Sequence, residues 1–155
     1  MLKNATFFRV VGEEEVSEGA GDDLYDVVDD LYDVEFRFNK EEGGFKGIRT
    51  VKNVLALTSP VFKQQFFGSL SARKRSQEEV STGIEVVTVE GFTFNLFKDF
   101  IELIISGNVQ IITGSTDFEF LFEMLKLADM YQVQDVVELV KSRIDSASVK
   151  ITLDK

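Results

Sequence analysis

The alternation of apolar and polar residues predicts a β-hairpin in the first half of the chain. Val34, Phe36 and Phe38 alternate with polar residues, which is the two-residue period of a strand with one buried face. Turn residues follow at Asn39–Gly44, so a second strand is expected at Phe45–Val51. Two antiparallel strands are therefore the first element of the predicted fold.

Two short helices are expected directly after the hairpin. The apolar spacing becomes helical at Val51, Val54, Leu55 and Leu57. Proline disfavours α geometry in the residue before it but fits the first turn of a helix. Because Ser59-Pro60 follows, the first helix should end near Thr58 and the second should begin at Pro60. The second helix is predicted to bury Val61, Phe62, Phe66 and Phe67 and to end at Gly68.

The second half of the chain is predicted to be mainly helical. A third strand at Ile84–Val89 precedes a helix that opens at Phe92 and ends at Gly107. The apolar positions of this helix are Phe94, Phe97, Phe100, Ile101, Ile104 and Ile105. A short strand is expected at Val109–Ile112.

Two more helices are expected after that strand. Thr116 and Glu119 have the spacing of a capping box, in which the threonine accepts a hydrogen bond from the third helical residue and the glutamate reaches back. The apolar positions that follow are Phe118, Leu121, Phe122, Leu125 and Ala128. The last helix turns Val136, Val137, Val140 and Ile144 inward, and residues 145–155 are interpreted as a frayed tail.

The N-terminal region contains a repeat with seven-residue spacing, Asp22–Val27 and then Asp29–Val34. Its apolar residues Leu24, Val27, Val28 and Leu31 fall on one face of a predicted amphipathic helix. The aspartates lack the glycine and final glutamate of a calcium-binding loop, so a solvated helix face is preferred. Residues 1–21 are interpreted as a flexible leader, with an exchanged strand near Phe7–Val11 as the alternative.

Composition limits the chain to one domain and disfavours two classes of partner. A length of 155 residues with 44% apolar content suits one domain with a real core, assigned to residues 22–146 with a tail at residues 147–155. A net charge of −10 repels phosphate groups, so neither nucleic acid nor an anionic membrane is expected as a partner. No cysteine, signal peptide or membrane-spanning stretch is evident, so we expect a soluble intracellular protein, cytoplasmic or nuclear.

Neither catalysis nor a cofactor or metal is predicted. The chain contains no histidine and no cysteine, which removes the usual general base and the commonest metal ligands. Paired carboxylates such as Asp22-Asp23 and Glu78-Glu79 lie in stretches predicted to be exposed, whereas acid-base catalysis needs a desolvated carboxyl group. A carboxylate-dependent hydrolase is kept as a distant alternative, which a buried carboxylate pair in a pocket would support.

The order of these elements and two sequence blocks resemble the BTB/POZ domain, a protein-interaction and dimerisation module. The matching residues are Asp33-Val34, Leu55-Ala56, Ser59-Pro60-Val61-Phe62 and Leu127-Ala128-Asp129-Met130-Tyr131. The departures are Thr50-Val51-Lys52, which lacks the family's histidine, and Ile105-Ser106-Gly107, which lacks its tyrosine. The resemblance implies an α+β fold in which a small sheet is flanked by a cluster of helices.

The resemblance also implies a homodimer. In this family the helix before the Asp-Val strand packs against its counterpart in the partner subunit. The implied dimer interface consists of Leu24, Val27, Val28, Leu31, Val51 and Val54. The alternative is a helix that only caps its own subunit.

Many BTB domains bind a cullin and serve as adaptors of ubiquitin ligases, through an apolar residue followed two positions later by an acidic one. The corresponding positions here are Leu70 and Ala72, and Arg73-Lys74-Arg75 reverses the local charge. The expected contacts to a cullin or another partner are Phe66, Phe67, Leu70, Ala72 and Tyr131. The predicted function is a scaffold or adaptor, linked to a cullin-RING ubiquitin ligase or, alternatively, to a transcriptional or cytoskeletal partner.

Overall fold

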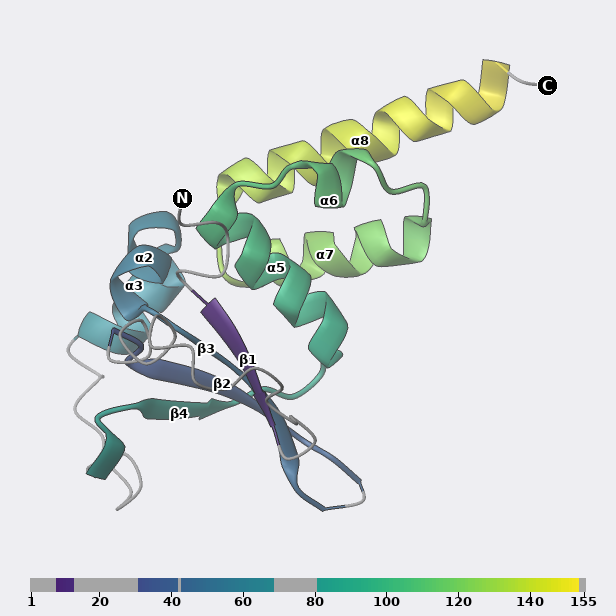
Figure 1. The fold of residues 1–155 in the computed structure, drawn as a ribbon. Helices are drawn as coiled ribbons and strands as arrows, with labels where there is room; N and C mark the ends of the chain where they lie inside the picture. The colour runs from purple at the N-terminus through teal and green to yellow at the C-terminus, as the bar shows by residue number, and fades with distance from the viewer. Residues whose placement is uncertain (1–7, 13–30, 42, 69–80, 154–155) are drawn as a thin grey trace, which may run out of the picture.

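The fold is a four-stranded sheet with helices packed on one of its faces (Figure 1). The computed structural model describes residues 8–12, 31–41, 43–68 and 81–153. The strands are β1 (Phe8–Gly12), β2 (Val34–Asn39), β3 (Phe45–Thr50) and β4 (Glu85–Thr88). The helices are α2 (Lys52–Thr58), α3 (Pro60–Phe67), α5 (Phe94–Ser106), α6 (Gln110–Thr113), α7 (Phe118–Met130) and α8 (Gln134–Leu153). The predicted α+β class is confirmed.

The predicted hairpin is present and forms the centre of the sheet. Its turn uses Gly43 and Gly44, whose φ angles of 87° and 80° are available to glycine without a steric penalty. The backbone N–H of Lys40 donates to the carbonyl of Gly44 at 3.1 Å and closes the turn. β1 pairs antiparallel with β3, and β4 pairs parallel with β2, so the strand order is β1-β3-β2-β4.

Aromatic rings join the sheet to the helices. The ring of Phe36 on β2 lies 5.6 Å from that of Phe62 on α3 and 4.9 Å from that of Phe97 on α5, measured between centroids. Phe62 also stacks on Tyr131, between α7 and α8, at 4.2 Å. Phenylalanine buries a large apolar area and has no polar atom to satisfy. These rings therefore form a densely packed core that links four elements.

The predicted helix boundaries around Ser59-Pro60 are confirmed. α2 ends at Thr58 and α3 begins at Pro60, with the side chain of Ser59 accepting a hydrogen bond from the backbone N–H of Phe62 at 3.0 Å. Gly68 follows the last residue of α3, as expected. Gly107 ends α5 in the left-handed conformation, with φ of 68°.

The predicted strand at Val109–Ile112 is wrong, because these residues begin the short helix α6. The backbone of Val109 is helical, and its carbonyl accepts from the N–H groups of Ile112 and Thr113. The side chain of Asn108 also accepts from the backbone of Gln110 at 3.3 Å. β-Branched residues favour strands only where a neighbouring strand can pair with them. Here local hydrogen bonds replace that pairing.

The predicted capping box is wrong by one residue. Asp117, not Thr116, is the N-cap of α7, and its carboxylate accepts from the backbone N–H of Phe120 at 3.2 Å. The hydroxyl of Ser115 accepts in turn from the backbone of Asp117. Aspartate is at least as good an N-cap as threonine, so sequence alone does not separate the two positions.

Three apolar residues assigned to buried helix faces are exposed instead. Phe67 on α3 is 53% exposed, because its neighbour Phe66 takes the buried position. Leu57 on α2 is 87% exposed and Phe122 on α7 is 49% exposed. On each helix the buried position is a neighbour, Leu55 or Leu121. Leu57 lies about 200° around the helix axis from Leu55, so the two cannot share one buried face.

Both ends of the described chain are more regular than expected. Phe8–Gly12 form a strand that pairs with β3 of the same chain, where sequence analysis favours a flexible leader. α8 continues to Leu153 instead of fraying from residue 145, and Ala147 is buried. The predicted amphipathic helix at residues 22–32 lies outside the described residues, except for its last two residues.

We expect truncation of Phe62 to destabilise the domain severely. Phe62→Ala removes a fully buried ring that stacks on both Phe66 and Tyr131, and such a change costs about 3–5 kcal/mol of unfolding free energy. The matched control is Phe67→Ala on the same helix, whose ring is half exposed and should cost far less. Urea denaturation measures both, and equal losses would contradict the core described above.

Candidate protein-interaction surface

Large apolar side chains lie exposed on several elements of the described structure. They are Leu31 (58% exposed), Leu57 (87%), Phe67 (53%), Val109 (47%), Phe122 (49%) and Met130 (55%). Single exposed apolar residues are normal on a protein surface, so only those that other contacts bring together are informative.

One polar contact brings exposed Leu57 and Met130 into the same region. The hydroxyl of Ser59 donates to the backbone carbonyl of Tyr131 at 2.5 Å, and Ser59 is fully buried. This bond joins the turn between α2 and α3 to the turn between α7 and α8. Leu57 is two residues from Ser59, and Met130 is the residue before Tyr131. The structure therefore places two exposed apolar side chains close to one buried joint.

The two adjacent phenylalanines of α3 point in different directions, as their 100° separation on a helix requires. Phe66 is buried and its ring stacks on Phe62 at 5.7 Å between centroids. Phe67 is exposed. Of these two expected partner contacts, Phe67 lies on the surface and Phe66 belongs to the core.

Tyr131, another expected partner contact, also belongs to the core. Its side chain is buried, with its ring stacked on Phe62 and 5.9 Å from the ring of Phe100. Desolvation by this burial raises the pKa of the Tyr131 hydroxyl above its usual value. Leu70 and Ala72, the remaining expected contacts, lie outside the described residues.

Two segments that contribute to the implied dimer interface lie side by side in the structure. Asp33 accepts from the backbone N–H of Lys52 at 2.8 Å, and its own N–H donates to the carbonyl of Thr50 at 3.1 Å. The chain around residues 31–33 therefore runs beside residues 50–52. Leu31 is exposed there, and Val51 and Val54 are half-buried. Leu24, Val27 and Val28 lie outside the described residues.

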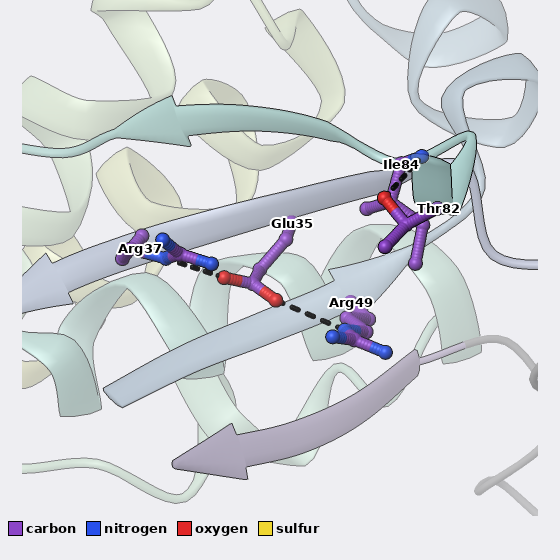
Figure 2. Close-up of polar contacts among 5 residues, drawn as sticks. All are labelled: Glu35, Arg37, Arg49, Thr82 and Ile84. Carbon is purple, nitrogen blue, oxygen red and sulfur yellow. Dashed lines mark hydrogen bonds and ion pairs between the residues drawn. The ribbon is translucent and has the colours of Figure 1, made fainter. Parts of the chain in front are cut away.

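The polar residues that sequence analysis misses serve architecture. Glu35 on β2 is 1% exposed and its two carboxylate oxygens accept from Arg37 at 2.6 Å and Arg49 at 2.9 Å (Figure 2). Gly47 leaves room for this carboxylate, because a Cβ there would lie 3.2 Å from the Glu35 side chain. Lys52 pairs with Glu85 at 3.0 Å and fastens the start of α2 to β4. Period-two patterning assigns these side chains to a face but not to a partner.

Other chemistry has little support in the described residues. No cluster of three or more acidic side chains there is placed to hold a metal ion. The pKa of Asp99 on α5 is raised by burial, an effect that Lys98 opposes and Glu102 reinforces. None of the helices in the described part of the chain combines the length and apolar character that a membrane-spanning segment requires.

Comparison with known proteins identifies the family. A family model for the BTB/POZ domain matches residues 26–148. The chain belongs to the BTB/POZ domain family. It is therefore a protein–protein interaction module, of a family whose members often dimerise and are generally not enzymes.

The structural comparison agrees with this family. The chain resembles the BTB domain of zebrafish PATZ1 with a TM-score of 0.50 and 16% sequence identity, over 86% of this chain and 98% of that one. At this identity the likeness supports the fold. A search of curated protein sequences found no match.

We expect Ser59→Ala to cost more stability than a matched change at another N-cap. Thr93 caps α5 in the same way, with its hydroxyl 3.2 Å from the backbone nitrogen of Leu96, and Thr93→Ala should cost about 1 kcal/mol. Ser59→Ala also leaves the carbonyl of Tyr131 without its donor, which adds about 1–3 kcal/mol. Chemical denaturation of the two variants compares them. Equal costs would show that the bond between the two turns contributes nothing.

Proposed function

We propose that this BTB/POZ domain acts as a homodimeric scaffold or adaptor that recruits other proteins inside the cell, in the cytoplasm or nucleus. The observation that carries the proposal is the exposed side chain of Leu31, because the contacts of Asp33 hold this segment beside residues 50–52, where Val51 is half-buried. Leu31 is largely exposed in the single chain. A second copy that covered this surface would remove apolar area from water, the main favourable term in association.

The polar chemistry of the domain supports a non-catalytic role. The buried carboxylate of Glu35 is held by two guanidinium groups, and the buried hydroxyl of Ser59 is held by two backbone groups. A catalytic acid or nucleophile needs a partner that activates it and space for a substrate. These side chains are instead engaged in holding strands and turns together.

A cullin is the partner class that we favour, bound through the exposed end of α3. Phe67 offers an exposed aromatic ring there, and Leu70 supplies the apolar residue of the family's cullin motif. Ala72 stands where that motif has an acidic residue, so part of the usual polar recognition is missing. A non-cullin partner on the same surface is the alternative, and binding experiments separate the two.

The dimer is tested with Leu31→Glu. This substitution should leave the monomer folded, since Leu31 is exposed, but should place an unpaired charge in the dimer interface and halve the mass. Phe122→Glu, a similarly exposed apolar position on α7, is the matched control and should keep the wild-type mass. Light scattering over a range of concentrations measures this. A wild-type monomer, or a Leu31→Glu variant of unchanged mass, would contradict the assigned interface.

The cullin assignment is tested with a loss and a gain of binding. Phe67→Glu should abolish capture of a cullin N-terminal domain, whereas Phe122→Glu should retain it. Ala72→Glu should strengthen capture, because it restores the acidic residue of the motif. Pull-down against a panel of purified cullins gives the readout. A folded dimer that binds no cullin, with or without Ala72→Glu, would favour the non-cullin alternative.

A further inference from the structure

The outer edge of β1 carries backbone groups that point away from the sheet. Antiparallel pairs alternate between residues that exchange both backbone hydrogen bonds and residues that exchange none. The bond from Lys40 to Gly44 closes the hairpin turn. Counting in alternation from the Lys40–Gly44 pair, the backbone groups of Ile48 bond to β2. The backbone groups of its neighbours Gly47 and Arg49 therefore bond to β1.

The other edge of the sheet gives the same alternation independently. The carbonyls of Asp33 and Arg37 accept from the N–H groups of Glu85 and Val89, each at 2.9 Å. The odd-numbered residues of β2 therefore face β4, which leaves the even-numbered residues facing β3. Both edges thus agree on which residues of β3 bond toward β1.

The direction of the β1 backbone follows from this register. Arg9 and Val11 lie opposite Arg49 and Gly47, so their N–H and carbonyl groups bond to β3. The backbone groups of Phe8, Val10 and Gly12 consequently point out of the sheet. Among the described strands β1 is an edge strand, with no neighbour on that side.

This edge carries few of the features that usually prevent strands of different molecules from pairing. Such features are proline, charged side chains (lysine above all), bulges and very short strands, and of these β1 has one charged residue, Arg9. β1 contains neither proline nor lysine, and its register with β3 is unbroken from Phe8 opposite Thr50 to Gly12 opposite Lys46. A regular strand with aligned donors and acceptors is a template for an additional strand.

We propose that β1 pairs antiparallel with β1 of a second copy of this chain, about a two-fold axis at Val10. In this register Val10 faces Val10 of the second copy, Phe8 faces Gly12, and Arg9 faces Val11. No like charges meet, and two β-branched valines form the central pair. The product is one continuous sheet with four strands from each copy. A second copy fits because the strand is complementary to itself under the two-fold rotation.

This contact goes beyond the dimer proposed above and uses a different surface. A five-residue pairing is smaller than a standard interface, which buries roughly 1,200–2,000 Å², so it is weak by itself. If the copies also form the dimer through Leu31, avidity strengthens the β1 contact. Two different two-fold contacts on one chain link dimers into larger assemblies, which are closed where the two axes intersect and open-ended where they do not.

Proline substitutions in β1 can remove either an N–H that points out of the sheet or one that bonds to β3, so they distinguish the proposed contact from the fold itself. Val10→Pro removes only an outward N–H, which edge strands tolerate, so the fold and its melting temperature should be preserved. Assembly beyond the dimer, measured by sedimentation velocity over a concentration series, should be lost. Val11→Pro, the matched control, removes an inward N–H and should lower the melting temperature. Unchanged assembly in a folded Val10→Pro variant would overturn the proposal.

Disulfide trapping provides a second test, because the chain contains no cysteine of its own. In the proposed register the two residue-10 Cα atoms lie about 5.5 Å apart, which suits a disulfide. Under mild oxidation Val10→Cys should cross-link at least about tenfold faster than Leu57→Cys, whose greater exposure controls for random collision, since docking raises the effective concentration.

The same pair of variants in the Leu31→Glu background distinguishes this contact from the dimer interface. Preferential cross-linking at residue 10 there supports the β1 contact even if the interface at Leu31 proves wrong. If Val10→Cys cross-links no faster than Leu57→Cys in either background, the β1 contact is overturned. The mass of Leu31→Glu without cysteine reports on the dimer interface separately.

Discussion

The ring of Phe62 is the contact on which the rest of the structure depends. It touches Phe36 of the sheet, Phe66 of its own helix and Tyr131 at the joint of α7 and α8. The backbone N–H of Phe62 is held by Ser59, whose hydroxyl also donates to the carbonyl of Tyr131. The sheet, α3 and the C-terminal helices are therefore joined at one point by apolar packing and by hydrogen bonds. Because Phe66 packs in the core, the adjacent Phe67 on the same helix points to the surface.

Charged groups in this domain organise the sheet and its connection to α2. Glu35 neutralises Arg37 on its own strand and Arg49 on the next, across the space left by Gly47. The carboxylate of Asp33 accepts a hydrogen bond from the backbone N–H of Lys52, and Glu85 forms an ion pair with the Lys52 side chain. A buried charge is costly unless it is paired and hydrogen-bonded, which explains why these groups occur in sets. In the described residues, the outer edge of β1 and the exposed apolar side chains are the features that we propose for contacts with other molecules.

The overall charge constrains how such contacts form. Two copies with a net charge of −10 each repel one another over a distance that the Debye length of the solution sets. Self-association must therefore come from short-range terms, which are burial of apolar side chains and pairing of backbone groups. In the assembly that we propose, the surface around Leu31 would supply the first and the edge of β1 the second.

Much of the local structure was determined by the sequence alone. Three sequence signals act within a few residues: the alternation of Val34, Phe36 and Phe38, the turn glycines and the Ser59-Pro60 step. They predicted the hairpin and the boundary between α2 and α3 correctly. The family followed from the same blocks. These signals are reliable because steric limits and local hydrogen bonds act without help from distant parts of the chain.

The tertiary structure decided everything that depends on a distant partner. Val109–Ile112 became helical because none of the described strands lies beside it, and Phe8–Gly12 became a strand because β3 lies beside it. Tyr131 entered the core because Phe62 stacks on it, and Glu35 is buried because two arginines reach it. A sequence pattern shows which side chains share a face, but burial depends on what packs against that face, and only the folded chain brings those residues together.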